Sequence, residues 1–213
     1  MSLDELENKF FKTNKQKTNM LFQTEDCVNG LNLPCSKLFE IKSSGNMSCL
    51  ELSLQWLSKA QRNGIGVLVD SECICSPEIL KKYDIDIKEL LYVQSNEPKI
   101  THEILYKLLE LKDIRLIVVS TVTMLFPLVY DIKEVATLFN KLKEKIQESN
   151  ASIIVVNPYY DLCYETFIKT INCQFKSKYL KRLKDEVEIG VEVNNFQDFN
   201  QIKEFSTSII YNH

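Results

Sequence analysis

From residue 37 onward, short runs of apolar residues alternate with longer segments in which apolar residues recur at helical spacing. The uninterrupted runs, several rich in β-branched residues, predict buried strands at residues 37–41, 66–70, 90–93, 115–119 and 152–156. Apolar residues at helical spacing, together with proline and glycine signals at helix ends, predict helices around residues 50–57, 77–82, 104–111 and 132–146. Strands and helices in alternation predict an α/β fold, with a mainly parallel central sheet covered by helices on both faces.

The two ends of the chain depart from this alternation. Residues 175–183, 187–193 and 205–211 predict strands with no strong helix between them, which indicates an antiparallel extension at one edge of the sheet. At the other end, residues 4–12 are charged with apolar breaks at Leu6, Phe10 and Phe11, and a polar stretch follows. We therefore expect an N-terminal helix and linker over residues 1–20 and a single core domain over residues 21–213.

Composition narrows the class of protein further. Of 213 residues, 45% are hydrophobic, and 26 basic against 29 acidic residues give a net charge of −3, so nothing in the overall charge points to nucleic acid. The seven cysteines follow an acidic, polar N-terminus unlike a signal peptide, so we expect free thiols and a cytoplasmic protein. No apolar run approaches the roughly 20 residues of a membrane span. With two histidines and no C-x-x-C pair, we expect no metal site.

A further observation concerns a set of segments that follow one another along the chain: Asn32–Ile41, Ala60–Gly64, Val67–Glu72, Tyr83–Leu91, Leu116–Ser120 with Leu125–Pro127, and Ser149–Asn157. In this order they resemble the ATPase core of the bacterial RecA recombinases. The resemblance implies a RecA-like P-loop NTPase-type three-layer fold, with nucleotide bound at the carboxyl ends of the strands. It also implies ATP and Mg²⁺ as the family's cofactors and a role in DNA recombination or repair.

The phosphate loop of that family requires the pattern G-x-x-x-x-G-K-[ST], because glycines let backbone amides wrap the phosphates and the lysine reaches them. The corresponding residues here are Ser43, Ser44, Gly45, Asn46, Met47, Ser48, Cys49 and Leu50. Serines replace both framework glycines, Cys49 stands at the lysine position, and Leu50 stands where a hydroxyl would bind Mg²⁺. The motif is therefore degenerate at every position that touches phosphate or metal.

The other parts of the family's ATPase machinery are also altered. Ser120 occupies the Walker B position, where the family has an aspartate, and Pro158 occupies the position of the polar sensor after Asn157. Residues 191–195 contain none of the paired lysines that reach a neighbour's ATP. Glu72 matches the water-activating glutamate and is a vestigial catalytic candidate. These losses predict a non-catalytic pseudo-ATPase that binds neither ATP nor Mg²⁺ and acts through protein–protein interaction.

Other interpretations of these residues remain open at this point. Cys49 is either a thiol activated by a helix N-terminus or a small apolar filler. Glu72 is alternatively an ordinary surface carboxylate, and Ser43, Ser44 and Ser48 are alternatively caps of the following helix. The bare helix N-terminus could still hold an anion. An enzyme of another kind, using Cys49 or Glu72 in the old cleft, would need a base that the two histidines are poorly placed to supply.

Two kinds of partner follow from the chain. Leu6, Phe10 and Phe11 match in position the helix with which RecA-like proteins contact a neighbour, so they predict docking on a RecA-type protein or self-association; folding back onto the core is the alternative. DNA is a weaker expectation, in which the chain is a residual ATP- or single-stranded-DNA-binding protein. It depends on aromatic residues in the 158–170 segment, which could instead pack on the domain, and on a basic run at residues 176–184, which could instead be a solvated edge. The 127–131 connection, at the position of the family's first DNA loop, is far shorter than the family's.

Overall fold

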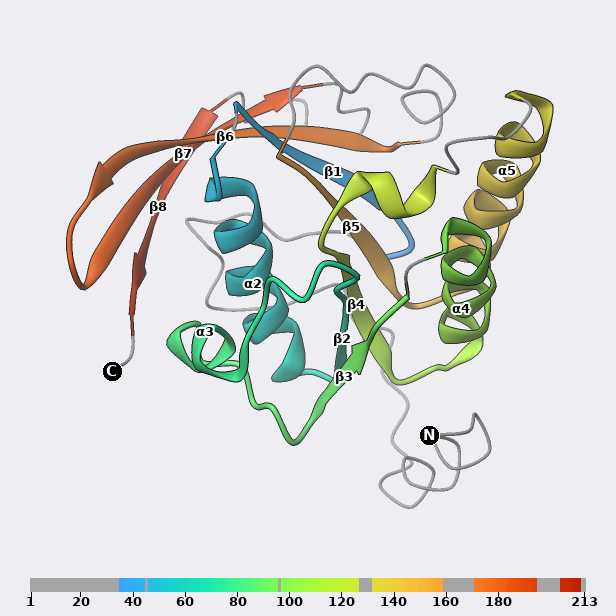
Figure 1. The fold of residues 1–213 in the computed structure, drawn as a ribbon, viewed down its shortest axis with the longest axis horizontal. Helices are drawn as coiled ribbons and strands as arrows, with labels where there is room; N and C mark the ends of the chain where they lie inside the picture. Colours follow the sequence, from blue (N-terminus) through green and yellow to red (C-terminus); the bar gives the residue numbers. More distant parts are fainter. Residues whose placement is uncertain are drawn as a thin grey trace.

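The computed structural model describes residues 35–44, 46–95, 97–126, 132–158, 171–194 and 204–211. They form one eight-stranded sheet in the order β3-β2-β4-β5-β1-β6-β7-β8 (Figure 1). The strands are β1 (Leu38–Ser43), β2 (Ile65–Val69), β3 (Leu90–Val93), β4 (Ile114–Val119), β5 (Ser152–Asn157), β6 (Cys173–Arg182), β7 (Glu186–Asn194) and β8 (Glu204–Ile210). The helices are α2 (Ser48–Gln61), α3 (Pro77–Lys82), α4 (Pro98–Glu110), the 3₁₀ helix η1 (Val122–Leu125) and α5 (Ile132–Glu148).

The pairing of the strands confirms the predicted architecture. Strands β3, β2, β4, β5, β1 and β6 pair in parallel, whereas β6, β7 and β8 pair antiparallel at one edge. Parallel neighbours need crossover connections, and the helices between the strands supply them. The antiparallel edge begins where the helical spacing in the sequence stops.

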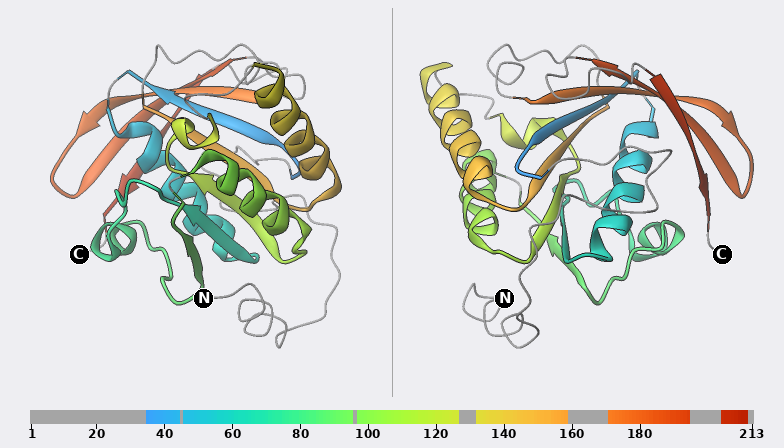
Figure 2. Two further views of the ribbon diagram at one scale, coloured as in Figure 1. Left: turned by 45° about the vertical axis from the view of Figure 1, so that its right-hand side comes forward. Right: turned by 180° about the vertical axis from the view of Figure 1, so that it is seen from behind.

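Two apolar layers hold helices against the sheet (Figure 2). Helices α2 and α3 cover one face, where Leu57 and Leu68 are fully buried. Helices α4 and α5, with η1, cover the other, where Phe139 and Val119 are fully buried. Each central strand supplies side chains to both layers in turn, because successive strand residues point to opposite faces. This alternation explains why these strands are apolar throughout.

Local signals fix several element ends. The Ser76 hydroxyl accepts the Ile79 N–H at 3.4 Å, and Pro77 occupies the first turn of α3, so this helix begins as predicted. Helix α4 begins at Pro98, six residues before the predicted start. The prediction missed these first turns because the residue buried there is Thr101 and not an apolar residue. The η1 helix was not predicted.

Some predictions lie outside the described residues or are not tested by them. Leu6, Phe10 and Phe11 lie outside, and the division into residues 1–20 and 21–213 stays a prediction. Among the described cysteines, Cys35, Cys49, Cys73, Cys75 and Cys173 form no disulfide bond. Within the described ranges, no helix has both the length and the apolar character needed to cross a membrane.

Candidate functional site

The expected phosphate loop connects β1 to α2 at the carboxyl end of the sheet. Ser43 is the last residue of β1 and Ser48 the first of α2, and both are buried. Ser44 is exposed, Met47 is 41% exposed, and Gly45 lies outside the described residues. The topology therefore brings these positions to the place where an open α/β sheet binds ligands.

The polar groups of this loop bond to one another. The Ser43 hydroxyl donates to the Asn46 carbonyl oxygen at 2.5 Å, and the Asn46 side-chain oxygen accepts the Ser48 N–H at 2.9 Å. Met47 is the N-cap residue of α2 and makes no side-chain cap bond. Serine capping is therefore wrong as an interpretation, since Asn46 satisfies the first helical amide instead. That amide already has an acceptor and is not left open for an anion.

Cys49, at the lysine position, is fully buried in the layer between α2 and the sheet. Its sulfur lies 3.1 Å from the Ser43 oxygen, where either group can be the donor, and the thiol also donates to the Asn46 carbonyl oxygen at 3.7 Å. Burial raises the pKa of the Cys49 thiol to about 11, and the bond from Ser43 offsets this only in part. Cys49 is thus a neutral buried thiol, which favours the apolar-filler interpretation over the reactive one.

The two flanking positions of the helix start are also turned inward. The Ser48 hydroxyl lies 2.9 Å from that of Ser177 on β6, and both residues are buried. Leu50, at the Mg²⁺ hydroxyl position, is 4% exposed and packs in the same apolar layer as Cys49. A serine at a glycine position is accommodated here because the neighbouring strand supplies a hydrogen-bond partner.

The Walker B position lies one residue beyond β4. Ser120 donates its N–H to the Val69 carbonyl at 2.9 Å, which places it beside Asp70 at the end of β2. One Asp70 carboxylate oxygen accepts from the Cys75 N–H at 2.8 Å and the Tyr92 hydroxyl at 3.0 Å. The other Asp70 oxygen and the Ser120 hydroxyl are buried without a hydrogen-bond partner in the described structure.

Glu72 lies on the β2–α3 loop. The Asp70 carboxylate, which accepts from the Cys75 N–H and the Tyr92 hydroxyl, ties this loop to β3. The Glu72 side chain is exposed, and no hydrogen bond or ion pair within the described residues joins it to a neighbouring group. The exposure agrees with the interpretation of Glu72 as a surface carboxylate. Within the described residues, no three His, Cys, Asp or Glu side chains gather as a metal site would require.

A buried polar network that the sequence analysis missed lies on the other face of the sheet. The Glu40 carboxylate accepts from the Asn157 amide at 2.7 Å and from the Gln174 amide at 2.7 Å, and the Lys42 ammonium lies 3.6 Å away. Glu40 and Asn157 are fully buried. The sequence signal for this network was Glu40 itself, a glutamate inside an apolar strand, because a buried carboxylate needs hydrogen-bond donors or a cation beside it. The network joins β1, β5 and β6.

The residues present do not fit ATP and Mg²⁺. No cation stands at the phosphate-binding position, because Cys49 is neutral and buried. No oxygen stands at the metal-binding position of α2, because Leu50 replaces the hydroxyl. The loop amide at Ser48 is already bonded to Asn46. Positions 49 and 50 thus supply neither the lysine charge nor the metal-binding hydroxyl that the motif provides.

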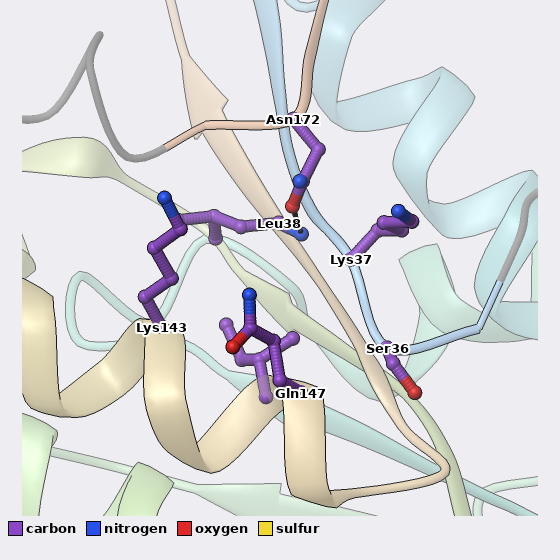
Figure 3. Close-up of a pocket in the computed structure, with 7 residues that line it drawn as sticks. Ser36, Lys37, Leu38, Lys143, Gln147 and Asn172 are labelled. Atoms are coloured by element: carbon purple, nitrogen blue, oxygen red, sulfur yellow. Dashed lines mark hydrogen bonds between the residues drawn. The ribbon is translucent and has the colours of Figure 1, made fainter. Parts of the chain in front are cut away.

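A shallow pocket lies at the opposite end of β1. Its lining residues are Ser36, Lys37, Leu38, Lys143, Ile146, Gln147 and Asn172 (Figure 3). The Asn172 side-chain oxygen accepts the Leu38 N–H at 2.8 Å, and Lys37 and Lys143 bring two basic side chains to the lining. The pocket lies at the start of β1 and the loop after Ser43 at its end, so the pocket is separate from the candidate nucleotide site.

The basic run falls on β6, opposite glutamates of β7. Lys176 pairs in register with Glu192 and Lys181 with Glu188, so the two strands carry opposite charges. An irregularity between Tyr179 and Lys181 shifts the register, and the Arg182 guanidinium lies 5.3 Å from the Tyr179 ring centre. The basic residues are balanced by this acidic strand. The two expected DNA loops, at residues 127–131 and 158–170, lie outside the described residues except for Pro158.

Comparison with known proteins identifies a relationship for most of the chain. A family model described as the RecA N-terminal domain matches residues 23–159, which is more than half of the 213 residues. The matched region includes β1 to β5 and the helices between them. No curated protein matches the chain.

Proposed function

The chain belongs to the RecA N-terminal domain family, and on that premise we propose that it is a pseudo-ATPase of the DNA recombination or repair type. In this proposal the chain keeps the family fold, neither binds nor hydrolyses ATP, and acts through contacts with other proteins. Regulation or capping of a RecA-type assembly is the role that fits a fold retained without its chemistry.

One observation carries the proposal: the residue at the phosphate-binding lysine position is a buried, neutral thiol. An ammonium group there would have to emerge toward the phosphates, whereas the Cys49 sulfur is fully buried beside Ser43. The hydrogen bond from the Ser48 N–H to the Asn46 side-chain oxygen also supports the proposal, because a loop whose amide already has an acceptor needs no anion to order it. Leu50 and Ser120 remove the two protein groups that would hold Mg²⁺.

Calorimetric titration of ATP with Mg²⁺ into the purified protein tests the proposal directly. We expect no binding heat at millimolar nucleotide, while an ATPase-active RecA protein in the same buffer gives a clear isotherm. A Glu72→Gln variant is the matched control, because it removes the one retained catalytic candidate without touching the loop. Saturable ATP binding by the wild-type chain would contradict the proposal, and hydrolysis lost in Glu72→Gln would show a working site.

The interaction part of the proposal needs a separate measurement. Surface-bound chain is exposed to a purified RecA-type protein, with and without ATP on that partner. We expect binding that does not require nucleotide on this chain's side, and a substitution at Cys49 such as Cys49→Ala should leave it unchanged. Absence of binding at micromolar partner would restrict the proposal to loss of ATP turnover.

A further inference from the structure

Exposed apolar side chains gather at the tip of the β6–β7 hairpin. Within the described residues, six large apolar side chains are exposed, and three of them belong to this region: Leu180 at 51%, Leu183 at 49% and Ile210 at 72%. Leu183 donates its N–H to Glu186, and Ile210 pairs in register with Glu186, so the three strands meet in one row. We call Leu180, Leu183 and Ile210 the hairpin patch.

The hairpin patch lies on the face of the antiparallel strands that helices do not cover. The neighbouring residues Val187, Ile189 and Ile209 are buried in the α2 layer, so by strand alternation Ile210 points to the opposite face. Leu180 lies on that same outer face, because a Cβ at Gly190 would meet its side chain at 3.0 Å. In Figures 1 and 2 the hairpin curls away from α4 and α5.

Charges of opposite sign flank the hairpin patch on neighbouring strands. On β6, Lys178 and Lys181 are exposed, and on β7, Glu186 and Glu188 are partly exposed. None of these four side chains forms an ion pair within the described part of the chain. The outer face thus presents a basic row and an acidic row side by side, with apolar residues among them.

We propose that the hairpin patch is a self-association surface, and that its occupant is the same patch on a second copy of this chain. A two-fold axis through the patch lays the basic β6 row of one copy over the acidic β7 row of the other. The same operation brings the apolar residues of both copies together. A surface with both charge signs and a central apolar group is self-complementary, which a two-fold interface requires.

This inference goes beyond the proposed function and does not depend on the nucleotide site. It also differs from the self-association predicted for Leu6, Phe10 and Phe11, because it needs only the antiparallel strands. A nucleic acid is a poorer occupant, since the acidic β7 row lies beside the lysines. Apolar residues with charged residues around them are typical of a protein–protein interface.

Sedimentation equilibrium of the full chain over a range of concentrations tests the proposal. We expect a monomer–dimer equilibrium, weakened roughly tenfold or more by Ile210→Ser or Leu183→Ser, because central apolar contacts dominate interface energy. The matched control is Ile100→Ser, which changes a side chain of similar exposure, 44%, on α4. Circular dichroism checks that each variant is folded, and two separate patch variants guard against one misfolding.

Charge reversal identifies the occupant as a second copy. Lys181→Glu gives a face with excess acid and Glu188→Lys a face with excess base, so each variant alone should dimerise less than wild type. Mixed in equal amounts, the two variants should form a heterodimer, because each supplies the charge that the other lacks. A wild-type monomer at all concentrations, a dimer unchanged by both patch variants, or no heterodimer in the mixture would each overturn the proposal.

Discussion

Replacing Glu40 by glutamine perturbs the network that joins the three strands β1, β5 and β6. Glu40 is fully buried, and its two oxygens accept from Asn157 and Gln174, both at 2.7 Å. Glutamine has nearly the same shape but one oxygen and one NH₂ group, so one of the two amides faces another donor. Lys42, 7% exposed, loses the carboxylate 3.6 Å from its ammonium.

The cost follows from the interactions removed. A hydrogen bond to a charged group contributes about 1.5–3 kcal/mol, and a buried donor left without a partner costs about 1–3 kcal/mol. These two effects overlap, because they concern the same amide. We therefore expect Glu40→Gln to lower the free energy of unfolding by about 2–4 kcal/mol. Removal of an exposed ion pair changes stability far less.

Urea unfolding followed by tryptophan fluorescence measures this change. Trp56 is the single tryptophan, 5% exposed, and its ring lies edge-on to that of Phe175 on β6 at 5.2 Å. The control is Glu110→Gln, which breaks an exposed ion pair with Lys145 at 2.8 Å and should leave the midpoint unchanged. A Glu40→Gln midpoint equal to that of the control would refute the reasoning.

Three further predictions concern side chains away from this network. His102 is fully buried, and burial lowers its pKa, so the unfolded chain binds the proton more readily than the folded one. The free energy of unfolding should therefore be highest above the unfolded-state pKa of about 6.5 and should fall as the pH drops below it. Melting temperatures of wild type and His102→Phe, measured across this pH range, check the prediction. Mass-spectrometric mapping of iodoacetamide labelling should find exposed Cys73 modified in the folded protein and Cys49, whose pKa is about 11, only after unfolding. Gly64→Ala should lower the melting temperature, because its Cβ would lie 2.6 Å from the Asp113 carbonyl oxygen. An unchanged melting temperature would mean that this turn moves freely.

Most of the fold could be predicted because its strands are recognisable from their runs of apolar residues. The runs at residues 66–70 and 152–156 are buried on both faces, and their polar residues, Asp70 and Ser152, stand at one end, so the apolar signal is not interrupted. Helix α4 was predicted too short because its first turns bury Thr101 and His102, whose burial depends on tertiary contacts. The 3₁₀ helix η1 has no periodicity long enough to detect in four residues.

For the candidate site, the identities of the replaced residues could be predicted, but the placement of their side chains could not. The sequence predicted which chemical groups were replaced, since that required only the identities at Cys49, Leu50 and Ser120. It could not predict where the replacements point: the bond from Ser48 to Ser177 joins residues 129 positions apart. The capping role of Asn46 was missed for the same reason, because either Asn46 or a serine could supply the oxygen until the backbone was known.

The hydrogen bonds of the β1–α2 loop bear on the proposal that this fold is kept without nucleotide. In a working site, backbone amides at the helix start are satisfied by phosphate, and a loop without phosphate leaves them unpaired. Here the Asn46 side-chain oxygen accepts the Ser48 N–H, and the Ser43 hydroxyl donates to the Asn46 carbonyl oxygen. The Cys49 sulfur lies in hydrogen-bond contact with the Ser43 oxygen. The Ser48 amide, which lies where a working site presents amides to phosphate, thus has an acceptor within the loop. Side chains at the replaced positions 43 and 49 therefore bond within the loop, together with Asn46, as the proposed loss of nucleotide binding requires.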